Sequence, residues 1–139
     1  GLTCNENSEL AGIPDFMIAP VVGPEVISGS TRLKAGTATK MVLNMLTTGA
    51  MVRLGKTFEN LMVDLRASNT KLTERTRHIV TLLTDLDANA AEKLLDSCEG
   101  ELKTALVSQL CKTSPAEARQ RLEKAQGHLR QALEETQHE

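Results

Sequence analysis

The sequence predicts an α/β fold that is mostly helical and ends in a small all-α tail. A short apolar run, Phe16–Val22, stops at Gly23-Pro24 and is typical of a strand buried on both faces in a parallel sheet. From about residue 30 to residue 55, apolar residues recur at three- and four-residue spacing, which indicates a long helix. Beyond residue 88 a helix-glycine-helix pattern occurs twice.

The long helix carries one continuous apolar stripe, with further apolar residues on its other sides. The stripe consists of Ala38, Val42, Met45, Leu46, Gly49 and Val52. A helix that is apolar on several sides is usually buried, so we expect it to pack against the sheet and against a second subunit. Ser28 or Ser30 can cap its first turn by accepting a hydrogen bond from a free N–H group.

A second amphipathic helix should follow the polar segment after residue 66. Ser68-Asn69-Thr70 supplies its cap. Its apolar face consists of Leu72, Thr76, Ile79, Val80 and Leu83. The next four residues, 84–87, are expected to form a linker.

The tail contains an internal repeat in which Ala91 recurs as Ala118, 27 positions on. The repeated positions are Ala91, Leu95, Gly100, Leu102, Ala105 and Leu106, matched by Ala118, Leu122, Gly127, Leu129, Ala132 and Leu133. Capping boxes are expected at Asn89 with Glu92 and at Ser114-Pro115 with Glu117, and the two glycines should provide left-handed turns. The tail either binds a partner or stabilises a dimer, or it is a packing cap for the main domain.

The segment from Gly23 to Lys40 is the strongest functional signal, because it is glycine-punctuated, rich in hydroxyls and basic. It opens into the long helix, and a helix start presents free N–H groups and a positive dipole end to an anion. The candidate anion-binding residues are Ser28, Ser30, Thr31, Arg32, Lys34 and Lys40. The alternative is that the hydroxyls only cap the helix and the cations form a solvated face.

Composition limits the classes of partner. The chain has 139 residues, a net charge of −2 and only two aromatic residues, Phe16 and Phe58, so nucleic-acid binding by base stacking is disfavoured. Positive charge is nevertheless local, since 26–58 contains five cations and no carboxylate. The three cysteines have no metal-binding spacing. No run of apolar residues approaches the roughly 18 that a membrane span needs, and a cytoplasmic location is expected.

The segment Gly23–Lys40 closely resembles the signature of the N-acetylmuramic acid 6-phosphate etherases and of the related glucokinase regulatory proteins. The similarity covers most of the chain; it includes Leu2–Asn5, Ser8, Met41–Lys56, Asn60–Arg66, Asn69 and Leu72. It implies a sugar isomerase (SIS) domain, a parallel sheet with flanking helices, of which this chain holds only the C-terminal part. Residues 1–66 would then belong to the SIS domain, 67–87 would connect it, and 88–139 would form the tail, which loosely resembles ubiquitin-associated (UBA) modules.

The resemblance also implies a chemistry and a division of roles. Such enzymes cleave the D-lactyl ether of N-acetylmuramic acid 6-phosphate, giving N-acetylglucosamine 6-phosphate and D-lactate, in a homodimer and without metal or cofactor. Their two catalytic glutamates, and the Ser/Thr loops that hold the sugar phosphate, lie ahead of anything in this chain, so it is expected to contain no catalytic residue and to be inactive alone. Its expected contribution is substrate binding by Glu25, Ser28, Ser30, Thr31, Arg32, Lys34 and Lys40.

Two other functions stay open from the residues. The chain would resemble a regulatory protein if it held a sugar phosphate without turning it over. It would be an interaction module if the long helix only dimerised and the tail recruited a protein. Glu25 lies in a basic loop, where a carboxylate more often organises the cations than acts as an acid or base.

Overall fold

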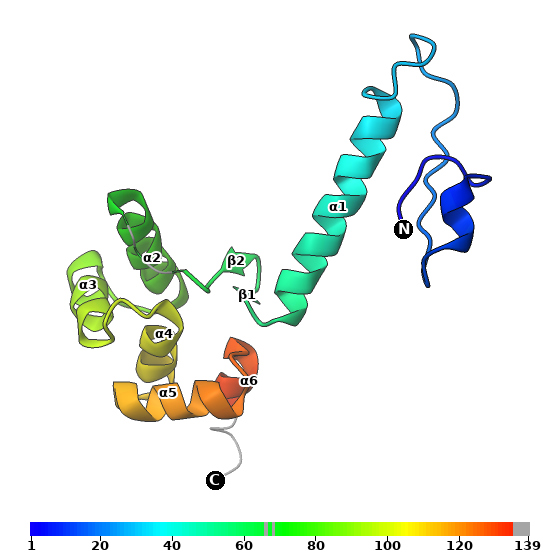
Figure 1. Cartoon of the computed structure of the whole chain (residues 1–139). Helices are drawn as coiled ribbons and strands as arrows, with labels where there is room; N and C mark the ends of the chain where they lie inside the picture. Colours follow the sequence, from blue (N-terminus) through cyan, green and yellow to red (C-terminus); the bar gives the residue numbers. More distant parts are fainter. Residues whose placement is uncertain (66, 68, 135–139) are drawn as a thin grey trace. The chain divides into compact units, whose positions relative to one another are not determined.

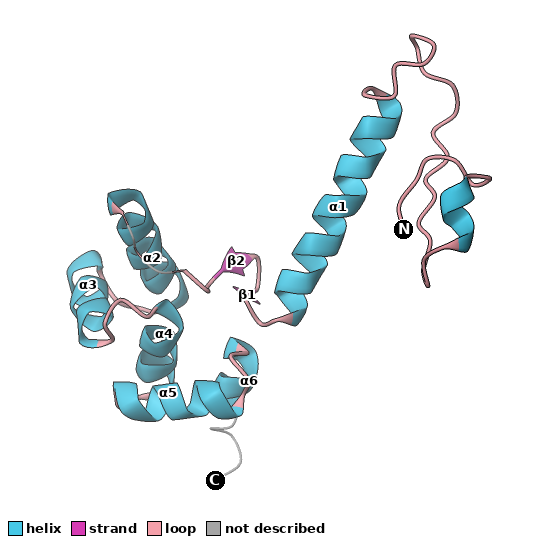
Figure 2. Ribbon diagram, in the orientation of Figure 1, coloured by secondary structure: helices cyan, strands magenta, loops and turns pink. Residues whose placement is uncertain are grey.

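The computed structural model describes residues 1–65, 67 and 69–134. Helices are the main secondary structure, as predicted (Figure 1 and Figure 2). The chain forms two compact units, one of Gly1–Ala50 and one that begins at Met51.

The first unit contains a parallel backbone pairing but no continuous strand. Leu2 pairs with Ile18 in a single parallel bridge, in which the Thr3 N–H donates to Ile18 O (3.1 Å) and the Ile18 N–H donates to Gly1 O (2.9 Å). A short 3-10 helix, Glu9–Gly12, lies between them in sequence. The predicted strand Phe16–Val22 is therefore wrong as a continuous strand, because a strand buried on both faces needs partners on both sides. Phe16 is 86% exposed.

The long helix α1 spans Lys34–Arg53, so the predicted helix exists but begins about four residues later than expected. The predicted burial of its apolar stripe against a sheet is wrong for this chain, since α1 contains no buried residue. Its burial against a second subunit stays a prediction. All of residues 1–50 are described, and none of them is buried. A helix is buried only where another element covers it, and the first unit supplies no such cover. The large apolar side chains that α1 exposes are Met41, Leu43, Met45, Leu46, Met51 and Val52.

The second unit opens with a two-stranded antiparallel hairpin. Strands β1 (Thr57–Phe58) and β2 (Leu61–Met62) pair Thr57 with Met62 and Phe58 with Leu61. Glu59, in the turn, has a positive φ of 51°. The strands are too short to show an alternating pattern, so the sequence does not predict this hairpin.

Helix α2 (Thr70–Leu83) confirms the predicted amphipathic helix. The Asn69 side chain caps it by accepting a hydrogen bond from the Leu72 N–H at 3.0 Å, whereas Ser68 lies outside the described residues. The helix buries Thr76, Ile79 and Val80.

The predicted repeat is confirmed as two helix-glycine-helix units. The first pairs α3 (Ala88–Ser97) with α4 (Leu102–Cys111), and the second pairs α5 (Pro115–Lys124) with α6 (Leu129–Glu134). Both glycines are left-handed, with φ of 75° at Gly100 and 79° at Gly127. The buried residues match at the repeat offset; they are Ala91 and Ala118, Leu95 and Leu122, Leu102 and Leu129, and Ala105 and Ala132.

One predicted cap of the repeat is confirmed and the other is wrong. Ser114 and Glu117 form the reciprocal capping box of α5, with Pro115 in the first turn. Helix α3 is capped by Asp87, whose side chain accepts from the Ala90 N–H at 2.8 Å, and not by Asn89. The helix therefore begins directly after the expected linker 84–87, and the last linker residue is its cap because Asp87 has the extended backbone that a cap requires.

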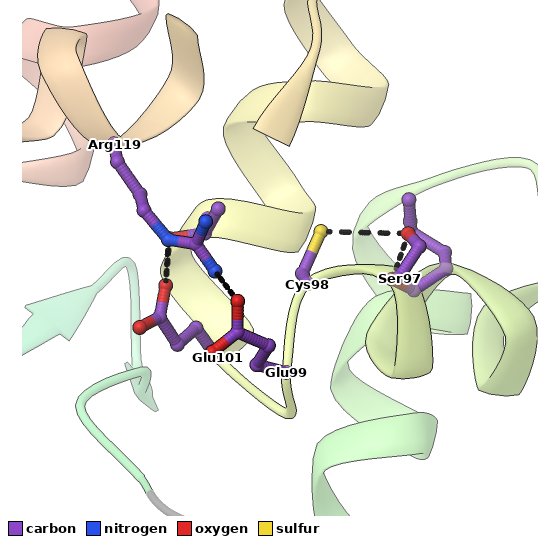
Figure 3. A network of polar contacts seen from close by, with 7 residues as sticks. Ser97, Cys98, Glu99, Glu101 and Arg119 are labelled. Carbon is purple, nitrogen blue, oxygen red and sulfur yellow. Dashed lines mark hydrogen bonds and ion pairs between the residues drawn. The ribbon is translucent and has the colours of Figure 1, made fainter. Parts of the chain in front are cut away.

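An ion-pair network joins the two repeats at the surface. The Arg119 guanidinium on α5 donates to Glu101 at 2.8 Å and to Glu99 at 3.0 Å, both beside the left-handed turn of the first repeat (Figure 3). Hydrogen bonding to Glu101 raises the pKa of Arg119, so the guanidinium stays charged. Cys98, in the same turn, is buried, and burial raises the pKa of its thiol.

The hydrophobic core lies entirely in the second unit. It extends from Val63, next to β2, through α2 and all four tail helices to Ala132. The end of the predicted segment 1–66 therefore belongs to the same compact unit as the predicted segments 67–87 and 88–139. The boundaries at residues 66 and 87 stay predictions of a functional division.

Candidate functional site

The start of helix α1 is held by the carboxylate of Glu25. The Lys34 N–H donates to Glu25 Oε2 and the Ala35 N–H donates to Glu25 Oε1, each at 2.9 Å. Glu25 reaches the helix from nine residues upstream, because Gly29 bends the intervening loop with a φ of 78°. The expected cap by Ser28 or Ser30 is thus replaced by a carboxylate that engages two N–H groups at once.

This contact determines the charge state and the role of Glu25. The backbone hydrogen bonds from Ala35 and Lys34 hold the pKa of Glu25 below its ordinary value, so the group is ionised at neutral pH. The carboxylate organises the loop through backbone N–H groups and not chiefly through ion pairing with the cations. Because it occupies the N–H groups of Lys34 and Ala35, these two donors are not available to a ligand anion.

A hollow of about 540 Å³ lies beside this cap, within the first unit. Its polar lining comes from two segments far apart in sequence, 3–5 and 25–39. The polar side chains on it are Thr3, Cys4, Asn5, Glu25, Thr31 and Thr39. Among the described residues that line it, none carries a positive charge.

Two of the predicted cations line a second hollow of about 530 Å³ on the first turns of α1. Arg32 and Lys34 lie there with Thr37 and Met41. The Lys34 Nζ atom also lies 3.8 Å from the position that a Cβ on Gly23 would occupy, and Gly23 lines the first hollow. Lys34 therefore lies close to both hollows, and a ligand with anionic and neutral parts can be held by groups of matching chemistry.

The structure thus separates the predicted binding residues into three sets. Glu25 and Thr31 line the first hollow, and Arg32 and Lys34 line the second. In this part of the chain, all of which is described, Ser28, Ser30 and Lys40 line neither hollow. Ser28 and Lys40 are exposed, and Ser30 is half-buried.

The predicted binding set omits four polar residues of the first hollow: Thr3, Cys4, Asn5 and Thr39. Cys4 Sγ lies 3.7 Å from Ala35 O and 3.9 Å from Thr39 Oγ1. These contacts span more than thirty positions of sequence, so no local pattern predicts them. The one available signal was the match of Leu2–Asn5 to the etherase family.

Two further properties limit the chemistry of the described residues. Within 1–65, 67 and 69–134, no three histidine, cysteine or acidic side chains gather in an arrangement that could hold a metal ion. Of the helices in this part of the chain, none is both long and apolar enough to span a bilayer.

Comparison with known proteins reveals extensive similarity to one enzyme group. A protein of Rhodopirellula baltica named N-acetylmuramic acid 6-phosphate etherase is 55% identical over 133 residues, which is 96% of this chain and 44% of the relative. Proteins of the same name from Klebsiella aerogenes and Rubrobacter xylanophilus are 53% and 56% identical, each over 135 residues. The chain spans less than half the length of these relatives, 45% and 44% for the latter two. No family model matches the chain.

Proposed function

This chain is homologous to the C-terminal half of the N-acetylmuramic acid 6-phosphate etherases, and we propose that it supplies that half of such an enzyme. The reaction is cleavage of the D-lactyl ether to give N-acetylglucosamine 6-phosphate and D-lactate. The observation that carries the proposal is identity above 50% across 96% of the chain, including the whole segment Gly23–Lys40 that surrounds the Glu25 cap.

The contribution of this chain is substrate binding. The substrate carries a phosphate and a lactate carboxylate, and Arg32 and Lys34 present two cations in one hollow at the start of α1. A guanidinium suits a bidentate contact with either anion, and an ammonium adds a point charge. Glu25 positions these residues by holding the first turn of α1. The acid and base that act on the sugar belong to the half of the enzyme outside this chain.

Other features fit the same proposal. The parallel bridge between Leu2 and Ile18 is the pairing that an SIS-type sheet requires, and the UBA-like tail would stabilise the domain. The exposed apolar side chains of α1 are suited to the interface of a homodimer. We further propose that the enzyme acts in the cytoplasm as a lyase in cell-wall sugar recycling.

The test uses this chain joined to the N-terminal length of the Rhodopirellula baltica relative, here called the joined protein. D-lactate release from N-acetylmuramic acid 6-phosphate is measured for the joined protein, for this chain alone and for the intact relative as a positive control. We expect release by the joined protein and none by the chain alone. Arg32→Ala and Lys34→Ala in the joined protein should each raise KM about tenfold or more, because each removes a charge-assisted contact.

Two results would overturn the proposal. Release by the chain alone would show that the catalytic groups lie within it. A joined protein that unfolds cooperatively on heating and binds sugar phosphate, yet releases no D-lactate, would favour the regulatory binder instead.

A further inference from the structure

We propose that the hollow formed by segments 3–5 and 25–39 is a subsite for the uncharged part of the substrate, its sugar hydroxyls and acetamido group. This inference rests on the proposed function and extends it to residues outside the predicted set, chiefly Cys4, Asn5 and Thr39. It leaves one anionic group of the substrate, the phosphate or the lactate carboxylate, to the neighbouring cationic hollow.

Charge is the first argument. The hollow is lined by one ionised carboxylate, Glu25, and by no described cation. A phosphate placed there would meet a like charge, whereas a sugar hydroxyl can donate to a carboxylate oxygen. Each Glu25 oxygen already accepts one N–H but has lone-pair capacity for a second donor. Lys34 Nζ lies close by, 3.8 Å from the position of a Cβ on Gly23, but the side chains that line the hollow suit hydroxyl groups better than an anion.

The remaining polar groups have capacity for a neutral ligand. Asn5 accepts the Asn7 N–H at its side-chain oxygen (3.1 Å), which leaves the two N–H bonds of its amide as donors. Thr3 accepts the Asn5 N–H at its hydroxyl oxygen (3.2 Å), and its hydroxyl hydrogen can still be donated. An acetamido carbonyl and ring hydroxyls need this mixture of donors and acceptors.

The wall formed by α1 is shaped to leave this space open. Cys4 and Thr39 are half-buried and face each other at 3.9 Å. Gly36 lies on the same wall, where a Cβ would come within 3.3 Å of Thr31 O. A larger residue at position 36 would crowd the loop that carries Thr31. The absence of a side chain thus preserves both the loop and the hollow.

Alkylation of Cys4 tests the occupancy directly. The joined protein is treated with N-ethylmaleimide, which adds to the thiolate sulfur, and the modification of each cysteine is followed by mass spectrometry. Saturating N-acetylglucosamine 6-phosphate should slow the reaction of Cys4 at least fivefold and leave Cys111 unchanged. Free N-acetylglucosamine at high concentration should also protect Cys4, whereas inorganic phosphate should not. Buried Cys98 is the slow internal reference.

A matched pair of threonine variants tests the contribution of the wall. Thr39→Val keeps the side-chain volume and removes the hydroxyl from the hollow, so it should raise KM about fivefold while kcat changes less than twofold. Thr47→Val removes a hydroxyl that bonds Leu43 O farther along the same helix and should leave both constants unchanged. Both variants should retain the thermal stability of the joined protein.

The outcomes separate this inference from the proposed function. If N-acetylglucosamine 6-phosphate inhibits D-lactate release but does not protect Cys4, the subsite is wrong and the etherase function stands. If Cys4 is protected and no D-lactate is released, the subsite stands and the etherase function fails. In the chain alone, Cys4 should react faster than Cys98; equal rates would show that the hollow is closed and would overturn the subsite. Protection by inorganic phosphate alone would also overturn it.

Discussion

At the scale of single residues, both the backbone conformation and the neighbours of position 55 require a glycine there. Its φ is +66°, and a Cβ there would lie 2.9 Å from His128 Cγ and 3.1 Å from His128 Cα. Gly55→Ala should therefore lower the free energy of unfolding by about 2–4 kcal/mol, from backbone strain plus overlap. Gly100→Ala is the control, because φ is +75° but nothing lies within 4 Å of the new Cβ.

The control should lose only about 1 kcal/mol, since it suffers the backbone strain alone. Urea unfolding of both variants measures the difference. Equal losses would mean that His128 moves away from residue 55 without cost.

Asp64 links two lysines of the second unit and makes its stability depend on pH. Its carboxylate pairs with Lys56 and, at 3.1 Å, with Lys103, whose ammonium also donates to Gly127 O at 2.9 Å. Partial burial raises the pKa of Asp64, but the hydrogen bonds from Lys56 and Lys103 outweigh it, so the pKa lies below the ordinary value of 3.8. The stabilisation is therefore present above pH 3.8 and is lost as the pH falls through the lower folded value.

Asp64→Asn should accordingly lower the free energy of unfolding by about 1 kcal/mol near pH 7, and by less near pH 3. Urea unfolding at the two pH values checks both the sign and the trend. Asp96→Asn, at an exposed carboxylate on α3, is the control and should show a smaller effect at neutral pH. A loss for Asp64→Asn that is the same at both pH values would contradict the assignment.

At the scale of secondary-structure elements, the cap of α3 distinguishes the structure from the sequence prediction. Asp87 accepts the Ala90 N–H at 2.8 Å, whereas the sequence pattern favoured Asn89 as the cap. Asp87→Ala should lower the free energy of unfolding by about 1 kcal/mol, because one helix N–H loses its partner. Asn89→Ala should have little effect, and thermal unfolding of both variants is the measurement. A larger loss at Asn89 would restore the predicted cap.

The elements that sequence reasoning predicted are those with local signals. Three predicted features depend on residues only a few positions apart, and all are confirmed. They are the apolar stripe of α2, the capping box at Ser114, and the left-handed turns at Gly100 and Gly127. The Glu25 cap and the contact between Cys4 and Thr39 depend on loop geometry over nine to thirty-five positions. Such contacts leave no periodicity, so the predicted site included Glu25 as an organiser of the cations but not as the cap of α1, and it omitted Cys4.

At the scale of the whole molecule, the two units differ in how they bury apolar surface. Every residue of the hydrophobic core lies between Val63 and Ala132, and none of residues 1–50 is buried. A parallel strand such as the one expected at Phe16–Val22 forms only with neighbours on its edges. Of the predicted parallel sheet, the described residues therefore form one parallel bridge, between Leu2 and Ile18.

This contrast predicts different behaviour for the whole chain and for a fragment of residues 51–139. The fragment contains the complete core and should unfold cooperatively as a monomer. The whole chain also exposes Met45 and Leu46 on α1, at 62% and 54%, within a wider apolar surface that should drive self-association in water. Sedimentation velocity over a range of concentrations should show association of the whole chain and not of the fragment.

Substitutions on two helices test whether α1 is the cause of that association. Met45→Gln combined with Leu46→Gln should reduce association of the whole chain, because it replaces apolar surface at the middle of α1. Leu82→Gln is the matched control, since Leu82 is 59% exposed but lies on α2 in the second unit. Association that survives the α1 substitutions but is lost in Leu82→Gln would assign the contact to the second unit. It would also remove the argument for a dimer through α1, because the apolar surface of that helix would then have no measurable consequence.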